Sequence, residues 1–296
     1  MVDYETKNFL GVLLRLRGSV LPQLLGRIFV CAALGAGAVW MFDEWGVKIP
    51  GTVHAMLGVA LGLLLVFRTS ASYDRYWEGR RLLGMLVNRS RDLQRQATAF
   101  IDGDGDEARA DRAEVQRLVV AFFALLRQYL RSERDLGKLG ATLTDAERAA
   151  LEPVAVRPNL AVAWLTQRLA ACLRAGRLSE RALEMMDLNV TSMVDSWGGA
   201  ERIMKTPIPF AYAQHIKAFL SLFCFTAPLA LVESLRWGTP LAAAVLAFGM
   251  FGIEQIGVEI EDPFGYDAND LPVDAIGDVI ARDTRAILAT RDPASE

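Results

Sequence analysis

Residues that could do chemistry are sparse along this 296-residue chain. Cys31, Cys172 and Cys224 lie far apart and lack CxxC or metal-ligand spacing, and the two histidines, His54 and His215, are too isolated for a histidine metal site. No nucleophile–base pair, phosphate-binding loop or zinc motif occurs either. The sequence therefore predicts a protein that is not an enzyme and that carries no cofactor.

A more informative pattern lies on an apolar stretch. Val59, Leu63 and Phe67 fall at positions i, i+4 and i+8, which share one face of a helix. Such a face could be buried in the core of the fold. It could instead line a pore, because rings of apolar side chains gate ion passage by excluding water.

The same helical face turns polar beyond Phe67, where it presents Ser70, Asp74 and Glu78. Rings of carboxylates attract cations, so these three residues are candidates for a pore vestibule and favour monovalent cations. Arg75 lies about 100° around the helix from Asp74 and could neutralise it. An ion pair at a subunit interface is therefore the alternative interpretation.

Four segments are apolar enough to cross a bilayer: residues 24–42, 52–67, 218–235 and 240–260. The second one reaches only about 24 Å at about 1.5 Å per residue, so we expect protein or a water-filled pore around it. Pro228, Glu233 and Glu254 within the last two segments indicate a packed bundle with an interior.

Basic residues are distributed unevenly around these segments. Arg15 and Arg17 precede the first one, and seven arginines follow the second within residues 68–95. The hairpins at 43–51 and 236–239 are poor in lysine and arginine. The positive-inside rule therefore predicts that both termini and the middle of the chain are cytosolic. The net charge of −3 argues against a nucleic-acid partner.

The middle of the chain is helical by periodicity, and a strand signal is absent almost everywhere. One apolar stripe runs from Val115 to Tyr129, and another from Met186 to Trp197, both at i, i+3, i+4 spacing. The sequence predicts an all-α membrane protein with four transmembrane helices and a helical cytosolic region. The expected parts are residues 1–67 with helices 1–2, the cytosolic region 68–206, residues 207–260 with helices 3–4, and a cytosolic segment 261–296.

Three motifs together resemble the bacterial branch of the bestrophins. They are FRTSASYDRYWEGR at 67–80, ERIMKTPIPFAY at 201–212, and DPFG at 262–265. Their order and their placement around the apolar segments match across nearly the whole chain.

The resemblance implies a homopentamer around one central pore in the bacterial plasma (inner) membrane. It places the family's hydrophobic neck at Val59, Leu63 and Phe67. It also implies a narrower cytosolic aperture on a later helix, which we expect at Leu178 or Ala182. The implied partners are other copies of the chain, the lipid bilayer and permeant monovalent ions.

Animal relatives bind calcium through a dense acidic cluster after the Pro-Phe-Gly motif, and this sequence departs from that pattern. Only Asp267 and Asp270 remain there, among Tyr266, Ala268 and Asn269. Calcium takes six to eight oxygen ligands, so we expect solvated acids here and no strong activation by calcium.

The sequence therefore predicts a passive channel for monovalent ions, with cations preferred. The first alternative is a chloride or anion channel of the same architecture. A secondary transporter would favour internal inverted repeats, which the sequence lacks. A membrane-anchored scaffold would make the pore-facing stripe incidental.

Overall fold

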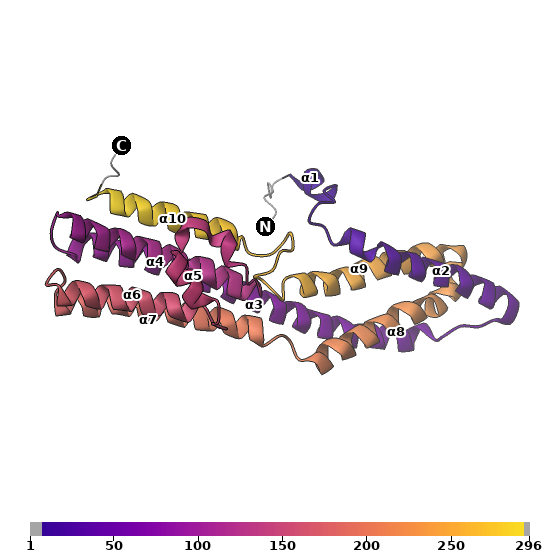
Figure 1. Cartoon of the computed structure of the whole chain (residues 1–296). Coiled ribbons are helices and arrows are strands. Elements are labelled where there is room, and N and C mark those ends of the chain that lie inside the picture. The colour runs from indigo at the N-terminus through magenta and orange to yellow at the C-terminus, as the bar shows by residue number, and fades with distance from the viewer. Residues whose placement is uncertain (1–7, 293–296) are drawn as a thin grey trace. The chain divides into compact units, whose positions relative to one another are not determined.

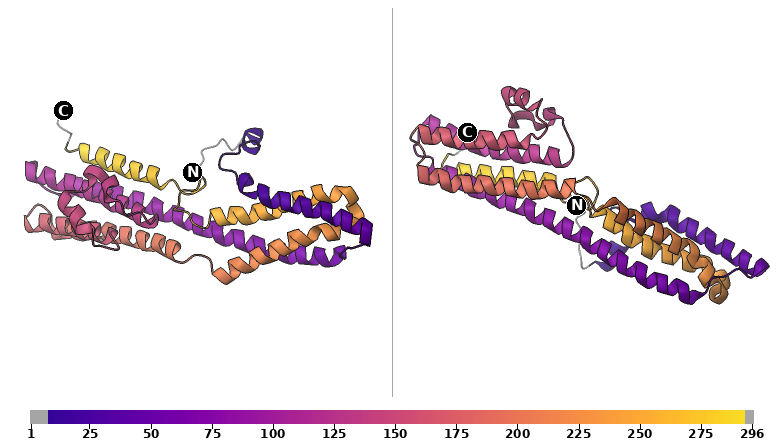
Figure 2. Two further views of the ribbon diagram at one scale, coloured as in Figure 1. Left: turned by 45° about the vertical axis from the view of Figure 1, so that its right-hand side comes forward. Right: turned by 90° about the horizontal axis from the view of Figure 1, so that it is seen from below.

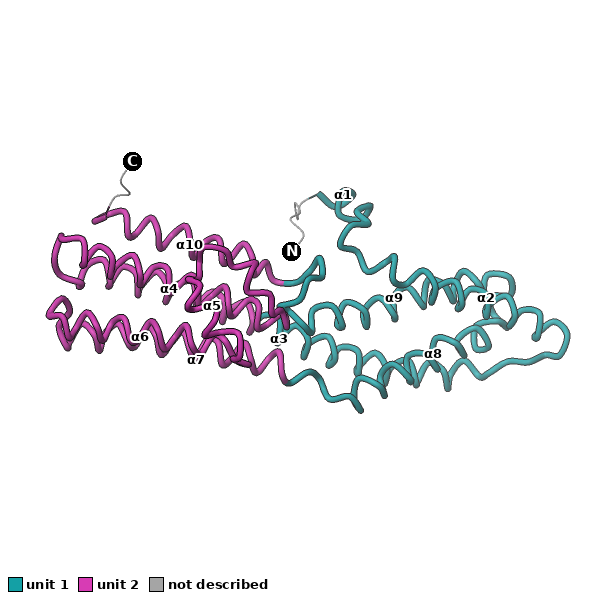
Figure 3. Tube along the Cα trace, viewed as in Figure 1, with its two compact units in different colours: residues 1–77, 206–270 teal, residues 78–205, 271–296 magenta. Residues whose placement is uncertain are grey.

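The computed structural model describes residues 8–292, so the outer ends of the first and last expected parts, residues 1–7 and 293–296, lie outside it. All regular secondary structure between residues 8 and 292 is helical. The chain divides into two compact units (Figure 3). Unit 1 contains residues 1–77 and 206–270, and unit 2 contains residues 78–205 and 271–296.

Unit 1 is built from long apolar helices. They are α2 (Leu21–Trp45), the first part of α3 (Gly51–Phe100), α8 (Phe210–Leu235) and α9 (Thr239–Glu259), preceded by the short α1 (Phe9–Leu13). Helices α2, α8 and α9 pack against one another, and the turn η2 (Arg236–Gly238) joins α8 to α9 (Figures 1 and 2).

Three helical stretches are long and apolar enough to cross a membrane: Leu21–Trp45, Gly51–Phe100 and Phe210–Glu259, the last comprising α8, η2 and α9. The four apolar segments of the sequence fall on these stretches. The helices extend beyond the segments because backbone hydrogen bonding continues after the apolar run has ended. Helix α3 shows this most clearly, since it continues from Phe67 to Phe100.

Small residues let the helices of unit 1 approach closely. A Cβ atom on Gly35 of α2 would lie 2.6 Å from the Cα atom of Pro240 at the start of α9. Close approach at glycine is common between membrane helices, where packing drives association. The buried core beside this contact is formed by Leu24, Cys31 and Ala247, among others.

Unit 2 is a separate bundle with its own core. Its helices are the second part of α3, α4 (Asp106–Leu130), η1 (Leu136–Thr142), α5 (Asp145–Leu151), α6 (Pro158–Arg174), α7 (Glu180–Lys205) and α10 (Val273–Ala289). Helix α4 packs against α6, α7 and α10. The two stripes expected from periodicity supply much of this core, since Val115, Phe122, Met186 and Trp197 are all buried.

Candidate pore-lining site

The face of α3 that carries the candidate neck is exposed on unit 1. The side chains of Val59, Leu63 and Phe67 are 77%, 57% and 58% exposed, whereas Leu61 and Leu65 on the opposite face are buried. Core side chains of a subunit are sequestered from its surface, so these three do not form a plain buried face within unit 1. They remain available to a pore or to another copy of the chain.

The opposite face of α3 is held against α8 at its N-terminal end. The His54 ring stacks on Phe223, with ring centroids 4.1 Å apart. Its Nε2 atom lies 3.0 Å from the carbonyl oxygen of Phe223. The sequence showed only that His54 is too isolated for a histidine metal site. In the structure it packs against Phe223.

A second anchor lies immediately after Phe67. The guanidinium of Arg68 is buried and donates to Glu261, with Nη2 and Oε2 2.5 Å apart. Arg68 also donates to the Ser72 hydroxyl at 3.2 Å. A buried charge is tolerated when it is paired and hydrogen-bonded, as Arg68 is here.

Glu261 joins three segments of unit 1. Besides Arg68, its carboxylate accepts a 2.9 Å hydrogen bond from the Ile208 backbone N–H. Its backbone carbonyl accepts from Arg75 Nε at 3.0 Å, and Arg75 also donates to the Thr206 carbonyl at 2.6 Å. Two arginines of the first motif and Ile208 of the second therefore meet at Glu261, the residue that precedes the third motif, through its carboxylate and its backbone carbonyl.

The first two vestibule candidates, Ser70 and Asp74, are exposed on unit 1. The Asp74 carboxylate accepts no hydrogen bond and makes no ion pair within residues 8–292. The sequence suggested Arg75 as its neutralising partner, but Arg75 donates to the Glu261 and Thr206 carbonyls. Asp74 thus presents a solvated negative charge on this surface.

The third vestibule candidate is compensated inside the subunit. Glu78 belongs to unit 2 and accepts from Arg202 Nη2 at 2.5 Å. Glu78 is about one-third exposed and Arg202 two-thirds exposed, so this pair is screened by water. The positive charge of Arg202 nevertheless offsets the negative charge of Glu78, so Glu78 contributes less negative potential to a vestibule.

The aperture candidates Leu178 and Ala182 lie in the core of unit 2, with 3% and 9% of their surfaces exposed. Buried side chains do not narrow a passage that runs outside their own subunit. Sequence periodicity placed them on one helical face but could not say whether that face points inward. The exposed positions near them on α7 include Met185 and Leu188 and charged residues of both signs, which sequence reasoning did not single out as aperture residues: Glu180, Arg181, Glu184 and Asp187.

The acids that follow α9 include one buried carboxyl. Asp270 is 3% exposed, and its Oδ2 atom accepts a 2.7 Å hydrogen bond from the Asp267 backbone N–H. Burial, reinforced by the charges of Asp267, Asp262 and Glu259, raises the pKa of Asp270 to about 6. Its Oδ1 atom has no hydrogen-bond partner within residues 8–292.

This acidic segment does not assemble a metal centre by itself. Within residues 8–292, no three histidine, cysteine or acidic side chains are grouped so that they could hold a metal ion. Gly265 packs so closely on Asp270 that a Cβ atom there would lie 2.7 Å from Oδ2. The expected absence of calcium activation stays a prediction.

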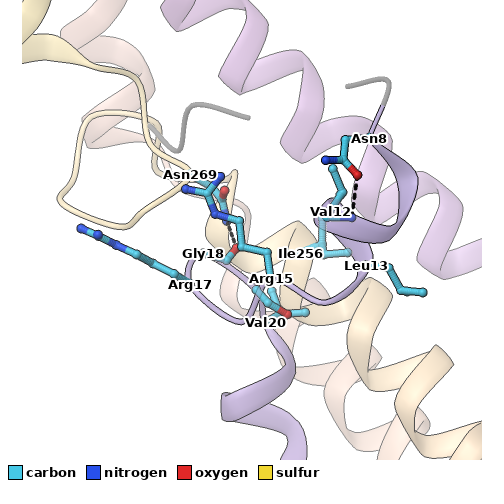
Figure 4. Close-up of a pocket in the computed structure, with 11 residues that line it drawn as sticks. Asn8, Val12, Leu13, Arg15, Arg17, Gly18, Val20, Ile256 and Asn269 are labelled. Carbon is cyan, nitrogen blue, oxygen red and sulfur yellow. Dashed lines mark hydrogen bonds between the residues drawn. The ribbon is translucent and has the colours of Figure 1, made fainter. Parts of the chain in front are cut away.

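The N-terminal segment folds over the same loop. Residues 8–20 enclose a cavity of about 450 Å³ with Ile256 and Asn269, and both Arg15 and Arg17 line it (Figure 4). The Asn269 amide nitrogen donates to the Gly18 carbonyl at 3.1 Å and to Glu259 at 2.7 Å. Asn269 therefore ties the segment before α2 to the end of α9.

Comparison with known proteins places this architecture in a family. A family model described as "Bacterial/Fungal Bestrophin protein" matches residues 1–286. A "Voltage-dependent anion channel-forming protein" of Synechocystis is 40% identical, and the match covers 90% of this chain and 87% of the relative. A Nostoc protein of the same description is 36% identical over 93% of this chain and 90% of its own length.

The fold agrees with this assignment. A crystal structure of a bacterial bestrophin homologue from Klebsiella pneumoniae superposes with a TM-score of 0.84 at 26% sequence identity, covering 90% of this chain and 98% of that one. The resemblance drawn from the three motifs is confirmed. The chain belongs to the bestrophin family, in its bacterial and fungal branch.

Proposed function

We propose that this chain is one subunit of a passive ion channel, a homopentamer with four transmembrane helices per subunit. The observation that carries the proposal is the exposed apolar face of α3. Val59, Leu63 and Phe67 stand on the surface of a helix whose other side is anchored through His54 and Arg68. A rigid helix presenting a row of apolar side chains is suited to form a dewetting constriction when copies surround an axis.

We further propose that the channel favours anions. The relatives at 36% and 40% identity are named as anion channel-forming proteins. The cation preference expected from the sequence relied on Asp74 and Glu78, and Glu78 is paired with Arg202. Asp74 remains as a solvated acid and is the observation that favours cations, so ion selectivity has to be measured directly.

A cytosolic aperture is proposed on the exposed face of α7. Among the described residues of unit 2, the exposed large apolar side chains are Met85, Met185 and Leu188. Two of the three lie on α7 among exposed charged residues of both signs, Arg181, Glu184 and Asp187. This face replaces Leu178 and Ala182 as the candidate aperture because it can reach a passage or a neighbouring subunit.

The proposed location is the bacterial plasma membrane, with both termini cytosolic. The support is the asymmetry of basic residues around the apolar helices. Arg15 and Arg17 lie before α2, and Arg68 and Arg75 stand where the apolar part of α3 gives way to its polar part. Arg68 and Arg75 both donate hydrogen bonds to Glu261.

The proposal is tested by ion flux from liposomes containing the purified protein. Replacing Val59, Leu63 and Phe67 together by alanine removes apolar bulk from each subunit, so flux should rise while the oligomer mass measured by native mass spectrometry stays that of a pentamer. A matched control replaces Val53, an exposed apolar residue of α3 outside the stripe, by alanine. Unchanged flux with loss of assembly would show that the stripe is a subunit contact.

A further inference from the structure

A buried carboxylate lies in the apolar part of unit 1, outside the candidate pore face. Glu254 of α9 has 3% of its side chain exposed. Its Oε1 atom is fully buried and has no hydrogen-bond partner among the described residues. Charged side chains within membrane-spanning helices are costly and usually serve a site, so an unsatisfied one needs a physical explanation.

Two basic residues flank Glu254 without hydrogen-bonding to it. Arg27 Nη1 lies 3.8 Å from Oε2, and Lys217 Nζ lies 3.6 Å from Oε1. Charge-assisted N–H···O hydrogen bonds are about 2.7–2.9 Å long, so both pairs are held apart. Both cations also keep substantial exposure, at 43% for Arg27 and 55% for Lys217.

A cavity of about 210 Å³ lies among these three charges. Its remaining wall is formed by the Ser221 hydroxyl side chain and by apolar residues: Leu220, Phe225 and Phe251. The cavity therefore combines two cations, one anion and an apolar flank. This combination matches an amphiphile whose polar end carries both signs of charge.

The cavity lies near one end of three apolar helices. Arg27 is six residues from the start of α2, Lys217 seven from the start of α8, and Glu254 five from the end of α9. At about 1.5 Å per residue, the three lie roughly 8–11 Å inside the helix ends. Lysine and arginine side chains near the ends of membrane helices extend toward the lipid headgroups.

We infer that this cavity binds the headgroup of a membrane phospholipid that carries a primary ammonium, as in a phosphoethanolamine lipid. The phosphate lies between Arg27 and Lys217, and the ammonium donates hydrogen bonds to Glu254. The acyl chains follow Phe225 and Phe251 toward the bilayer.

The choice of headgroup follows from the unsatisfied carboxylate oxygen. Glu254 lacks a hydrogen-bond donor, and an ammonium supplies three N–H groups. A choline headgroup carries the same charge but no N–H, so it cannot satisfy this oxygen. A purely anionic headgroup, or free phosphate, would bring further negative charge toward Glu254 without supplying a donor.

Native mass spectrometry of the delipidated, detergent-purified assembly tests the inference with added lipids. Phosphatidylethanolamine should bind about tenfold more tightly than phosphatidylcholine of the same chains, which is the discrimination of one charge-assisted hydrogen bond. Mono- and dimethylated ethanolamine lipids should bind like the parent, and affinity should fall when the third methyl group removes the last N–H. This series uses the unaltered chain and does not depend on any variant folding.

Variants assign the effect to the cavity. Glu254→Gln should remove the preference for the ethanolamine lipid. Lys217→Gln should weaken the binding of the ethanolamine and choline lipids by the same factor. Lys48→Gln, which removes an exposed lysine paired with Glu233, is the matched control and should change neither. Equal binding of the ethanolamine and choline lipids, or a preference that survives Glu254→Gln, would overturn the inference, as would tighter binding of phosphatidylglycerol.

Discussion

The two compact units differ in what their surfaces expose. Unit 1 leaves large apolar side chains uncovered on each of its long helices, including Phe29 on α2, Met56 on α3, Phe225 on α8 and Leu241 on α9. In unit 2 such exposure among the described residues is confined to α3 and α7. Exposed apolar surface of that extent suits lipid or neighbouring subunits, whereas the surface of unit 2 suits water.

The units also differ in how charges hold their helices. Arg112 in unit 2 is fully buried and donates to Asp292 and to the Ile101 and Gly103 carbonyls. Further arginine–carboxylate pairs tie α4 to α6 and α10 in this unit: Asp111–Arg168, Arg127–Asp274 and Arg131–Asp274. Among the described residues, unit 1 has fewer ion pairs than unit 2, and its buried charged side chains, Arg68, Glu254 and Asp270, lie at separate places. Unit 1 therefore relies on apolar packing and a few separate polar anchors, and unit 2 on a distributed ionic network.

The largest expected effect comes from removing a buried arginine that is paired with a carboxylate. Arg68→Met leaves Glu261 without its buried partner and should destabilise the protein by about 3–5 kcal/mol. Arg112→Met should cost a similar amount in unit 2. The loss of stability in both variants is measured as a fall in melting temperature, with thermal unfolding monitored by size-exclusion chromatography in detergent.

Two further variants sharpen this result. Arg68→Met combined with Glu261→Gln should recover part of the loss, because no buried charge remains unpaired. Lys48→Gln breaks an exposed pair and should cost no more than about 1 kcal/mol. A loss for Arg68→Met as small as that for Lys48→Gln would show that Glu261 is not an anchor of unit 1.

A smaller effect is expected from helix packing in unit 1. Gly35→Ala places a Cβ atom against the Pro240 backbone and should destabilise the protein by about 1–3 kcal/mol. Gly37→Ala is the matched control on the same helix, since nothing lies within 4 Å of its Cβ position. The control should be neutral or stabilising by up to about 1 kcal/mol, because alanine is the better helix former. Equal melting temperatures for the two variants would contradict close packing of α2 on α9.

The two units should also respond oppositely to acid. The folded-state pKa of Asp270 is raised to about 6 from an ordinary value of 3.8, so its contribution to stability falls as the pH rises through this interval. Asp270→Asn removes that penalty, so the variant should be about 1–3 kcal/mol more stable than the wild type at pH 8 and about equally stable at pH 4. Melting temperatures from pH 4 to 8, in the presence of a chelator, measure the difference. A difference in melting temperature between the variant and the wild type that does not depend on pH would refute the raised pKa of Asp270.

In unit 2 the pH dependence of stability has the opposite sign: acid weakens the unit instead of stabilising it. Hydrogen bonds from Arg112 lower the pKa of Asp292, and those from Arg91 lower the pKa of Asp283. The stabilisation from such groups is fully present above their ordinary pKa near 4 and is lost as the pH falls below it. Acidification from pH 8 to 5 should therefore leave this network intact while Asp270 takes up a proton.

The smallest expected effect is at the exposed Glu78–Arg202 pair. Glu78→Gln should change stability by less than about 1 kcal/mol, because the pair is screened by water. If the counter-charge of Arg202 cancels Glu78, this variant should also leave ion selectivity unchanged, whereas Asp74→Asn should shift it toward anions. Reversal potentials of the two variants separate these outcomes.

Much of the fold followed from sequence because its determinants are local. Apolar run lengths predicted the long helices, and helical periodicity predicted that Phe122 and Trp197 are buried. The family resemblance followed from motifs that meet at Glu261. The partner of Arg68 could not be predicted, because Glu261 lies 193 residues away and the chain offers many other acids.

The aperture residues show a second limit of prediction from sequence. The resemblance led us to expect the aperture at Leu178 or Ala182, but the sequence could not tell which side of that helical face is buried and which stays exposed. The exposed neighbours Arg181 and Leu188 emerged only from the packed bundle. Likewise, the sequence left open whether Arg75 neutralises Asp74, and the structure shows Arg75 donating to the backbone carbonyls of Glu261 and Thr206.

The most direct test of the central claim is a reversal potential in planar bilayers that contain the purified protein under a potassium chloride gradient. The proposed anion-favouring channel predicts a steady current that reverses near the chloride equilibrium potential. It also predicts a larger conductance when Val59, Leu63 and Phe67 are all replaced by alanine. Absence of current from an intact oligomer would contradict a channel function, and reversal near the potassium equilibrium potential would contradict the proposed preference for anions.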